Sequence, residues 1–251
     1  MVFLDQPAFC LCFVPVKNGA AVTFGLESAN VVGYQEKTIN AGGFSMTTPT
    51  FKAITGNYKI SDIKVKGTVD GYGSEFCQKL NEDGSWGQDY YYLTEENTGM
   101  PTGWYKDSSA GEAVTDDDTV KEGEALSFSV GCDFQMVFAG QVNKEKPEIT
   151  IPGGGFVMAG NPTPVAVKIS DLIVVGEVGG YGNEFGQKLN EDGSWGQDYY
   201  YLTEENTGMP TGWYKDSSAG EPVTDEDVLL PGEALSISAE SGFTLKFPSA
   251  M

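Results

Sequence analysis

The residues of this chain whose types and spacing could do chemistry are aromatic, and they recur in two sets. The members at equivalent places of a repeated segment are Trp86, Tyr91, Trp104 and Trp195, Tyr200, Trp213. Flat rings pack against the CH groups of a pyranose, while neighbouring carboxylates and amides bond its hydroxyl groups. These six residues are therefore candidates for binding a saccharide. Two such sites would add avidity for a repeating polymer.

Core packing is the alternative use of the same rings. Side chains alternate between the two faces of a β-strand, so the middle ring of Tyr90, Tyr91 and Tyr92 points away from its neighbours. At least one face of this segment must then be core. Both interpretations are open on the sequence alone.

Two acidic clusters could coordinate calcium, a hard cation that takes several oxygen ligands. Their candidate ligands are Asp116, Asp118, Asp225 and Asp227. The surrounding spacing is not that of an EF-hand loop. A solvated acidic loop without a metal is the alternative.

Two cysteines are lost together between the copies of the repeat. Cys77 corresponds to Gly186 and Cys132 to Ser241. Joint loss is what a bonded pair predicts, so we expect a disulfide between Cys77 and Cys132, which would imply an oxidising, exported setting. Two buried free thiols are the alternative.

Composition excludes several classes of function. The net charge is −21, all fifteen cationic side chains are lysine, and there is no histidine. Nucleic acid is excluded as a partner, because its phosphates would be repelled and no arginine is present to read bases. Imidazole-dependent catalysis and zinc sites lack their usual residue. We predict no enzyme and no cofactor other than calcium; glycoside hydrolysis by paired carboxylates is the third alternative, although no spacing selects a pair.

The chain is a tandem duplication. Residues 78–112 recur without a single change as residues 187–221, and the similarity extends to both sides. We expect an N-terminal extension at residues 1–28, a first unit at 29–140 and a second unit at 141–251. The extension is an atypical signal segment or an edge strand, and no apolar run is long enough to predict a transmembrane helix.

The apolar periodicity inside each unit is two. Leu126, Phe128 and Val130 alternate with serines, and Asp83-Gly84 marks a hairpin turn. The predicted fold class is all-β, with two antiparallel β-sandwich or barrel-like domains.

One strand changes character between the copies. Lys64 and Lys66 of the first unit correspond to Ile173 and Val175 of the second. The apolar pair either packs against the first unit or the N-terminal extension, or forms a surface for a partner or for self-association.

Two stretches resemble a known group of proteins. Residues 27–51, ESANVVGYQEKTINAGGFSMTTPTF, and residues 232–247, GEALSISAESGFTLKF, are similar to the opening and closing segments of uncharacterised exported tandem β-domain proteins of Gram-negative bacteria. The resemblance implies export and a role at the cell envelope or outside the cell. It carries no known site residues.

Together these features predict a non-catalytic secreted or cell-surface protein with a structural or adhesive role. A tandem carbohydrate-binding module that uses the repeated tryptophans and tyrosines is the alternative. The partners are then polysaccharide or a further copy of the chain.

Overall fold

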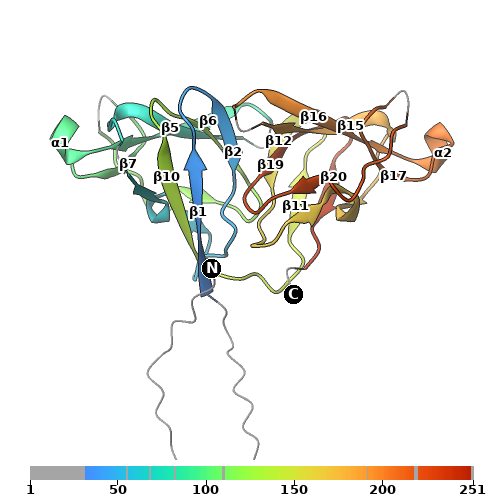
Figure 1. The fold of residues 1–251 in the computed structure, drawn as a ribbon, viewed down its shortest axis with the longest axis horizontal. Coiled ribbons are helices and arrows are strands. Elements are labelled where there is room, and N and C mark those ends of the chain that lie inside the picture. The colour runs from blue at the N-terminus through green and yellow to red at the C-terminus, as the bar shows by residue number, and fades with distance from the viewer. Residues whose placement is uncertain are drawn as a thin grey trace, which may run out of the picture.

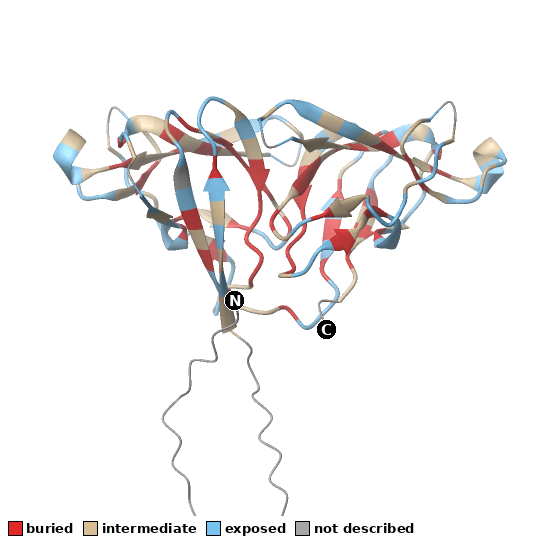
Figure 2. Cartoon of the chain, viewed as in Figure 1, coloured by how far each residue is buried: buried red, intermediate tan, exposed pale blue. Residues whose placement is uncertain are grey.

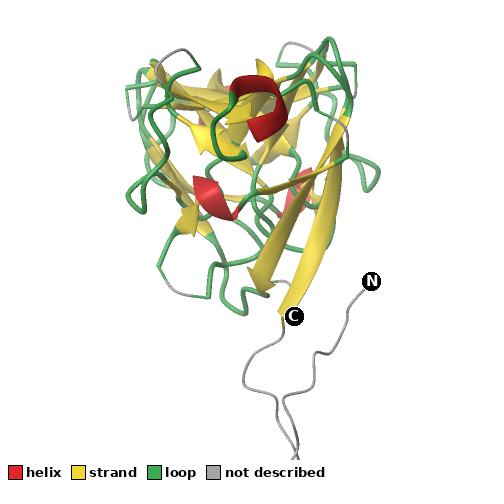
Figure 3. Cartoon of the chain, turned by 90° about the vertical axis from the view of Figure 1, so that its left-hand side faces the viewer, coloured by secondary structure: helices red, strands yellow, loops and turns green. Residues whose placement is uncertain are grey.

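The computed structural model describes residues 32–54, 56–67, 69–81, 83–108, 111–190, 192–217 and 220–249. The predicted N-terminal extension, residues 1–28, lies outside the described residues. Strands dominate both units, and the helical segments are single turns, as the side view in Figure 3 shows.

The two units follow the same order of elements. The first contains β1 (Val32–Ile39), β2 (Phe44–Thr47), β3 (Tyr58–Lys59), η1 (Ile60–Asp62), β4 (Lys64–Lys66), β5 (Tyr72–Leu80), β6 (Trp86–Leu93), α1 (Glu95–Thr98), β7 (Gly103–Tyr105), β8 (Thr119–Val120), β9 (Leu126–Ser129) and β10 (Phe134–Gln141). The second contains β11 (Glu148–Ile151), β12 (Gly155–Gly160), β13 (Val167–Lys168), η2 (Ile169–Asp171), β14 (Ile173–Val175), β15 (Tyr181–Leu189), β16 (Trp195–Leu202), α2 (Glu204–Thr207), β17 (Gly212–Tyr214), β18 (Val228–Leu229), β19 (Ala234–Ala239) and β20 (Phe243–Lys246).

Each unit contains three antiparallel sheets, which confirms the predicted all-β, duplicated fold. The five-stranded sheets have the orders β2-β9-β5-β6-β7 and β12-β19-β15-β16-β17. The three-stranded sheets are β1-β10-β4 and β11-β20-β14, and β3-β8 and β13-β18 complete the sets. Figure 1 shows the first unit in blue to green beside the second in yellow to red.

One hydrophobic core lies inside each unit, between its five-stranded and three-stranded sheets. In the first unit, Phe128 of β9 and Tyr90 of β6 meet Met136 and Phe138 of β10. Tyr91 points away from this core, as strand alternation predicts. In each unit, the face of the five-stranded sheet that carries Tyr91 or its equivalent Tyr200 is called the outer face. Figure 2 shows buried positions on the strands of both units and exposed positions at the outlying loops.

The two units meet through equivalent backbone groups. Thr48 N donates to Gly232 O at 3.0 Å, and Gly160 N donates to Gly123 O at 2.8 Å. The repeat aligns Thr48 with Gly160 and Gly123 with Gly232, so the contact has the form of a two-fold isologous interface within one chain. Equivalent side chains also pack across it, in a cluster of Met46, Ala125, Met158, Ala234, Leu80 and Leu189.

The hairpin tip of each unit lies against the other unit. Gly84, between β5 and β6, has φ +79, and a Cβ built on it would come within 2.6 Å of Phe156 N in β12. Gly193 has φ +78, and its Cβ would come within 2.5 Å of Phe44 N in β2. Both hairpin tips therefore require glycine for the backbone conformation and for the close approach.

Replacing Gly193 by alanine should weaken the contact between the units beyond the cost of the backbone conformation alone. Gly208 is the matched control, because its φ is +74 and nothing lies within 4 Å of its Cβ position. Gly208→Ala should lower the free energy of unfolding by about 1–2 kcal/mol. Gly193→Ala should lower it further, because Phe44 N is main-chain and has little room to move. Urea denaturation of both variants checks this, and equal losses would refute the expectation.

Candidate functional site

The six aromatic residues predicted to bind a saccharide fall into three pairs with different surroundings. Trp104 and Trp213 lie in the cores, each with an exposed fraction of 4%. Their indole N–H groups donate to Ile63 O at 3.0 Å and to Leu172 O at 3.1 Å. Both rings are therefore enclosed by the fold and are not available to a ligand.

Tyr91 and Tyr200 lie half-buried on the outer faces of their sheets. Tyr91 packs beside Phe76 with ring centroids 5.9 Å apart, and Tyr200 packs beside Phe185 at 6.0 Å. Their hydroxyl groups donate to Asp89 at 3.2 Å and to Asp198 at 3.3 Å. These rings form part of a surface, but each lies in its own unit.

Trp86 and Trp195 are the pair that the fold brings together. Each stands at the start of the second strand of its hairpin and is 57% exposed. Both line one cavity of about 570 Å³ that lies between the units, called the inter-unit cleft. The sequence placed these tryptophans in two separate sites, whereas the structure assigns them to a single shared one.

The inter-unit cleft is built from equivalent residues of the two units. Six identical pairs line it: Phe44 and Phe156, Met46 and Met158, Leu80 and Leu189, Gly84 and Gly193, Trp86 and Trp195, Ser127 and Ser236. Phe185 and Gln187 complete the lining. The hairpin tips hold this arrangement, because each glycine tip carries its tryptophan two residues later into the space beside the other unit.

Among the described residues, the lining of the inter-unit cleft carries no charge. Its fourteen residues include no lysine, aspartate or glutamate, in a chain whose net charge is −21. Two serine hydroxyls and the Gln187 amide supply hydrogen-bonding groups, and Phe44 (57% exposed) and Phe156 (50% exposed) add two further rings. An apolar, aromatic cavity with a few neutral polar groups suits an uncharged ligand with both CH faces and hydroxyls.

The acidic clusters are held by lysines rather than gathered around a common point. Asp116 lies 2.8 Å from Lys59 Nζ, and Asp225 lies 2.8 Å from Lys168 Nζ. Among the described residues, no group of three or more acidic, cysteine or histidine side chains is placed to hold a metal ion. The lysine contacts fit the ordinary acidic loop, and calcium binding by these residues stays a prediction.

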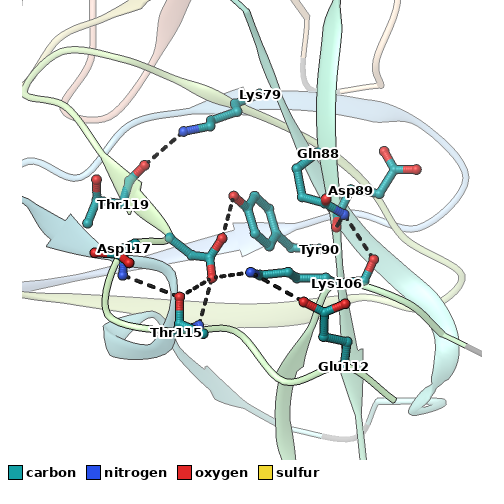
Figure 4. Close-up of polar contacts among 10 residues, drawn as sticks. Lys79, Gln88, Asp89, Tyr90, Lys106, Glu112, Thr115, Asp117 and Thr119 are labelled. Carbon is teal, nitrogen blue, oxygen red and sulfur yellow. Dashed lines mark hydrogen bonds and ion pairs between the residues drawn. The ribbon is translucent and has the colours of Figure 1, made fainter. Parts of the chain in front are cut away.

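Asp118 is the centre of a structural network that includes Tyr90, Thr115 and Lys106, three side chains labelled in Figure 4. Its Oδ2 accepts from Thr115 N at 2.7 Å and lies 3.1 Å from Lys106 Nζ, and Tyr90 OH donates to its Oδ1 at 3.3 Å. Burial alone would raise the pKa of Asp118, but the hydrogen bonds from Thr115 and Lys106 outweigh it and lower the pKa.

The second unit repeats this network around Asp227. Lys215 Nζ lies 2.9 Å from Asp227 Oδ2, and Tyr199 OH donates to Oδ1 at 3.3 Å. Burial, reinforced by the neighbouring Asp227 carboxylate, raises the pKa of Tyr199 to about 12. The hydroxyl therefore stays protonated and acts as a donor that fixes the loop to β16.

The predicted disulfide is wrong, because Cys77 and Cys132 are both free thiols. Cys77 points into the core of the first unit and is fully buried. Cys132 lies in the turn before β10, where its Sγ donates to Glu75 Oε1 at 3.3 Å. The thiol of Cys132 is thus directed to a buried carboxylate two residues before Cys77, and the bond needed for the inferred oxidising setting is not formed.

Ile173 and Val175 on β14 remain 52% and 46% exposed. Within the described part of the chain they are therefore not covered by the first unit. The N-terminal extension lies outside the described residues, and a partner surface stays a prediction.

Phe44 and Phe156 line the inter-unit cleft but were not among the site residues predicted from the sequence. Both belong to short stretches, FSMT and FVMA, in which phenylalanine and methionine alternate with smaller residues at matching places of the two copies. Phenylalanine and methionine two residues apart lie on the same face of a strand, so each stretch has one apolar face that another part of the protein would be expected to cover. This signal could have located the contact between the units.

Comparison of the chain with protein-family models, with curated proteins and with solved structures finds no match. The resemblance to exported β-domain proteins therefore stays a prediction. Within the described residues, no helix is both long enough and apolar enough to cross a membrane.

Acidification should remove the stability that Asp118 and Asp227 supply. A lowered pKa in the folded state means that this stability is complete above the ordinary carboxylate pKa of about 3.9. It is lost as the pH falls through the lowered folded-state pKa. The double variant Asp118→Asn, Asp227→Asn should unfold more easily than the wild type at neutral pH, by about 1 kcal/mol per site after solvent screening.

The free energy of unfolding is measured against pH for the wild type and for the double variant. The difference between the two should shrink as the solution is acidified. Asp117→Asn is the control, because Asp117 joins the network through its backbone N–H to Thr115 Oγ1 at 3.4 Å. If the difference in free energy of unfolding between the wild type and the double variant did not change with pH, the role given to the two carboxylates would be contradicted.

Proposed function

We propose that the chain is a non-catalytic, exported adhesive protein that binds a neutral saccharide in the inter-unit cleft. The observation that carries this proposal is the set of four half-exposed rings around an uncharged cavity: Phe44, Trp86, Phe156 and Trp195. Exposed large rings are costly on a soluble surface unless a ligand or partner covers them. Their gathering at one place therefore supports a binding role.

The chemistry of the lining favours a neutral sugar over other ligands. Pyranose CH groups pack on rings, and the hydroxyls of Ser127 and Ser236 with the Gln187 amide can bond sugar hydroxyls. A phosphate or sulfate would meet no cation among the described residues of the lining and would be repelled by the charge of −21. An uncharged glycan meets neither obstacle.

The shared cleft changes the expected mode of binding. Both tryptophans line one cavity, so the duplication supplies the two walls of one site instead of two independent sites. We infer one ligand per chain. Avidity for a polymer would then need several chains rather than the two units of one chain.

An exported location is part of the proposal. It is supported by the resemblance of residues 27–51 and 232–247 to segments of exported proteins, and not by a disulfide. A strongly acidic chain would remain soluble outside the cell and would be repelled by anionic surfaces, so attachment would depend on the cleft.

Removing the cleft tryptophans should weaken glycan binding. Trp86→Ala or Trp195→Ala should each lower the affinity about tenfold, which corresponds to about 1.4 kcal/mol, and the double variant should lose more. Calorimetric titration with soluble neutral oligosaccharides of glucose, mannose and N-acetylglucosamine measures this.

Tyr72→Ala, Tyr181→Ala is the matched control for that titration. These two rings are also equivalent and are 63% exposed, but they do not line the inter-unit cleft. The control should bind like the wild type. Wild-type protein that bound none of the oligosaccharides would overturn the proposal.

Structural self-association is a second candidate function, and the exposed strand β14 favours it. Ile173 and Val175 stand where the first unit carries Lys64 and Lys66, and both are about half exposed. An apolar, three-residue strand at the edge of a sheet lacks the charges that usually prevent association with another sheet edge.

Ile173→Lys, Val175→Lys should abolish self-association if β14 carries it. The variant restores the residue types of the first unit and keeps the chain folded. Sedimentation over a range of concentrations should show assemblies for the wild type and monomers for the variant, whereas the cleft variant Trp86→Ala should assemble normally. Wild-type protein that stays monomeric at all concentrations would eliminate this candidate.

A further inference from the structure

A shallow, open second cavity borders the inter-unit cleft on the outer face of the second unit. It has a volume of about 560 Å³ and shares Phe156 and Phe185 with the cleft. Its remaining lining comes from the turns and strands beside these rings: Gly154, Gly155, Gly182, Asn183, Ser238, Ala239 and Glu240. Because they share these two rings, the two cavities adjoin, and together they are called the extended groove.

The outer end of this groove is polar. Asn183 Nδ2 donates to Glu240 Oε2 at 2.6 Å, and both side chains are exposed. A carboxylate and an amide held together in this way present hydrogen-bonding groups of defined geometry to a sugar hydroxyl. The groove thus begins at the tryptophans and ends at a pair of polar side chains.

The first unit has no equivalent of this pair. Ser74 occupies the place of Asn183, and Gly131 the place of Glu240. The six residue pairs that line the inter-unit cleft are identical in the two units, but the polar pair in the second cavity is not. A ligand that extends beyond the cleft meets different chemistry according to which unit it enters.

We propose that the ligand is a linear, uncharged glycan that runs in one direction from Trp86 and Trp195, across Phe156 and Phe185, to Asn183 and Glu240. This inference rests on the proposed function and specifies its ligand. Each cavity alone is within the size range of a small-ligand site, so an occupant of both must be longer than one that fills either. The ring-lined middle suits stacked sugar faces, and the polar pair selects the orientation of the chain.

The length dependence of binding tests the extended groove. Glucose and N-acetylglucosamine oligomers, from disaccharides to longer chains, are titrated into the wild-type protein by calorimetry. Affinity should rise about tenfold or more from the disaccharide to the longer oligomers, because further sugars reach the second cavity. The stoichiometry should stay at one oligomer per protein.

The variant Asn183→Ser, Glu240→Gly gives the second unit the residues of the first. It should lose most of the gain for long oligomers and should bind the disaccharide like the wild type. Glu226→Ser is the control, because it removes one exposed carboxylate from the loop before β18, outside the groove. The control should keep the full length dependence.

An oligomer with a spin label at its reducing end tests the direction. It should broaden the NMR signals of residues at one end of the groove, either near Asn183 or near the tryptophans. Equal broadening at both ends would overturn a single orientation.

The failures of the two proposals can be told apart. If disaccharides bind but longer chains bind no better, or if Asn183→Ser, Glu240→Gly changes nothing, the extended groove is overturned and the cleft remains a sugar site. If no oligomer binds at any length, both proposals fall. If the wild type dimerises and Trp86→Ala abolishes the dimer, a second copy of the chain occupies the cleft, which also overturns the glycan.

Discussion

The close approach of two glycine hairpins to the strands of the opposite unit sets the geometry of the molecule. Gly84 lies against β12 and Gly193 against β2, each at a distance that a Cβ would not permit. Because these tips carry Trp86 and Trp195 two residues later, the same contact that joins the units also places the exposed rings. The same contact therefore determines both the stability of the interface between the units and the shape of the inter-unit cleft.

Many, but not all, of the residues at this contact are identical in the two copies. Leu80 and Leu189 are one identical pair, whereas Thr48 of the first unit corresponds to Gly160 of the second. In a two-fold contact, a residue of the first unit packs against the second unit as its equivalent in the second unit packs against the first. A change in one copy alone therefore disturbs the fit between the two surfaces. Lys64 and its counterpart Ile173, which lie outside the contact, have diverged without disturbing this fit.

The sequence predicted the fold well because its signals are local. The repeat gave two units, and the alternation around Phe128 and the Asp83-Gly84 turn gave antiparallel strands. The site was only partly predictable, because pairing of Trp86 with Trp195 depends on how the units dock. Joint loss of Cys77 and Cys132 suggested a bond, but each thiol had its own environment, core packing for one and a buried glutamate for the other.

Tandem linkage has a consequence for how such a site can evolve. A chain with a single copy would reach this arrangement only as a homodimer, and its exact two-fold axis would make both ends of any groove identical. Joining the copies in one polypeptide removes that restriction. Asn183 and Glu240 can then be present at one end while Ser74 and Gly131 remain at the other. Covalent fusion thus allows a two-fold symmetric binding site to become asymmetric, so that it can distinguish the two ends of a polymer.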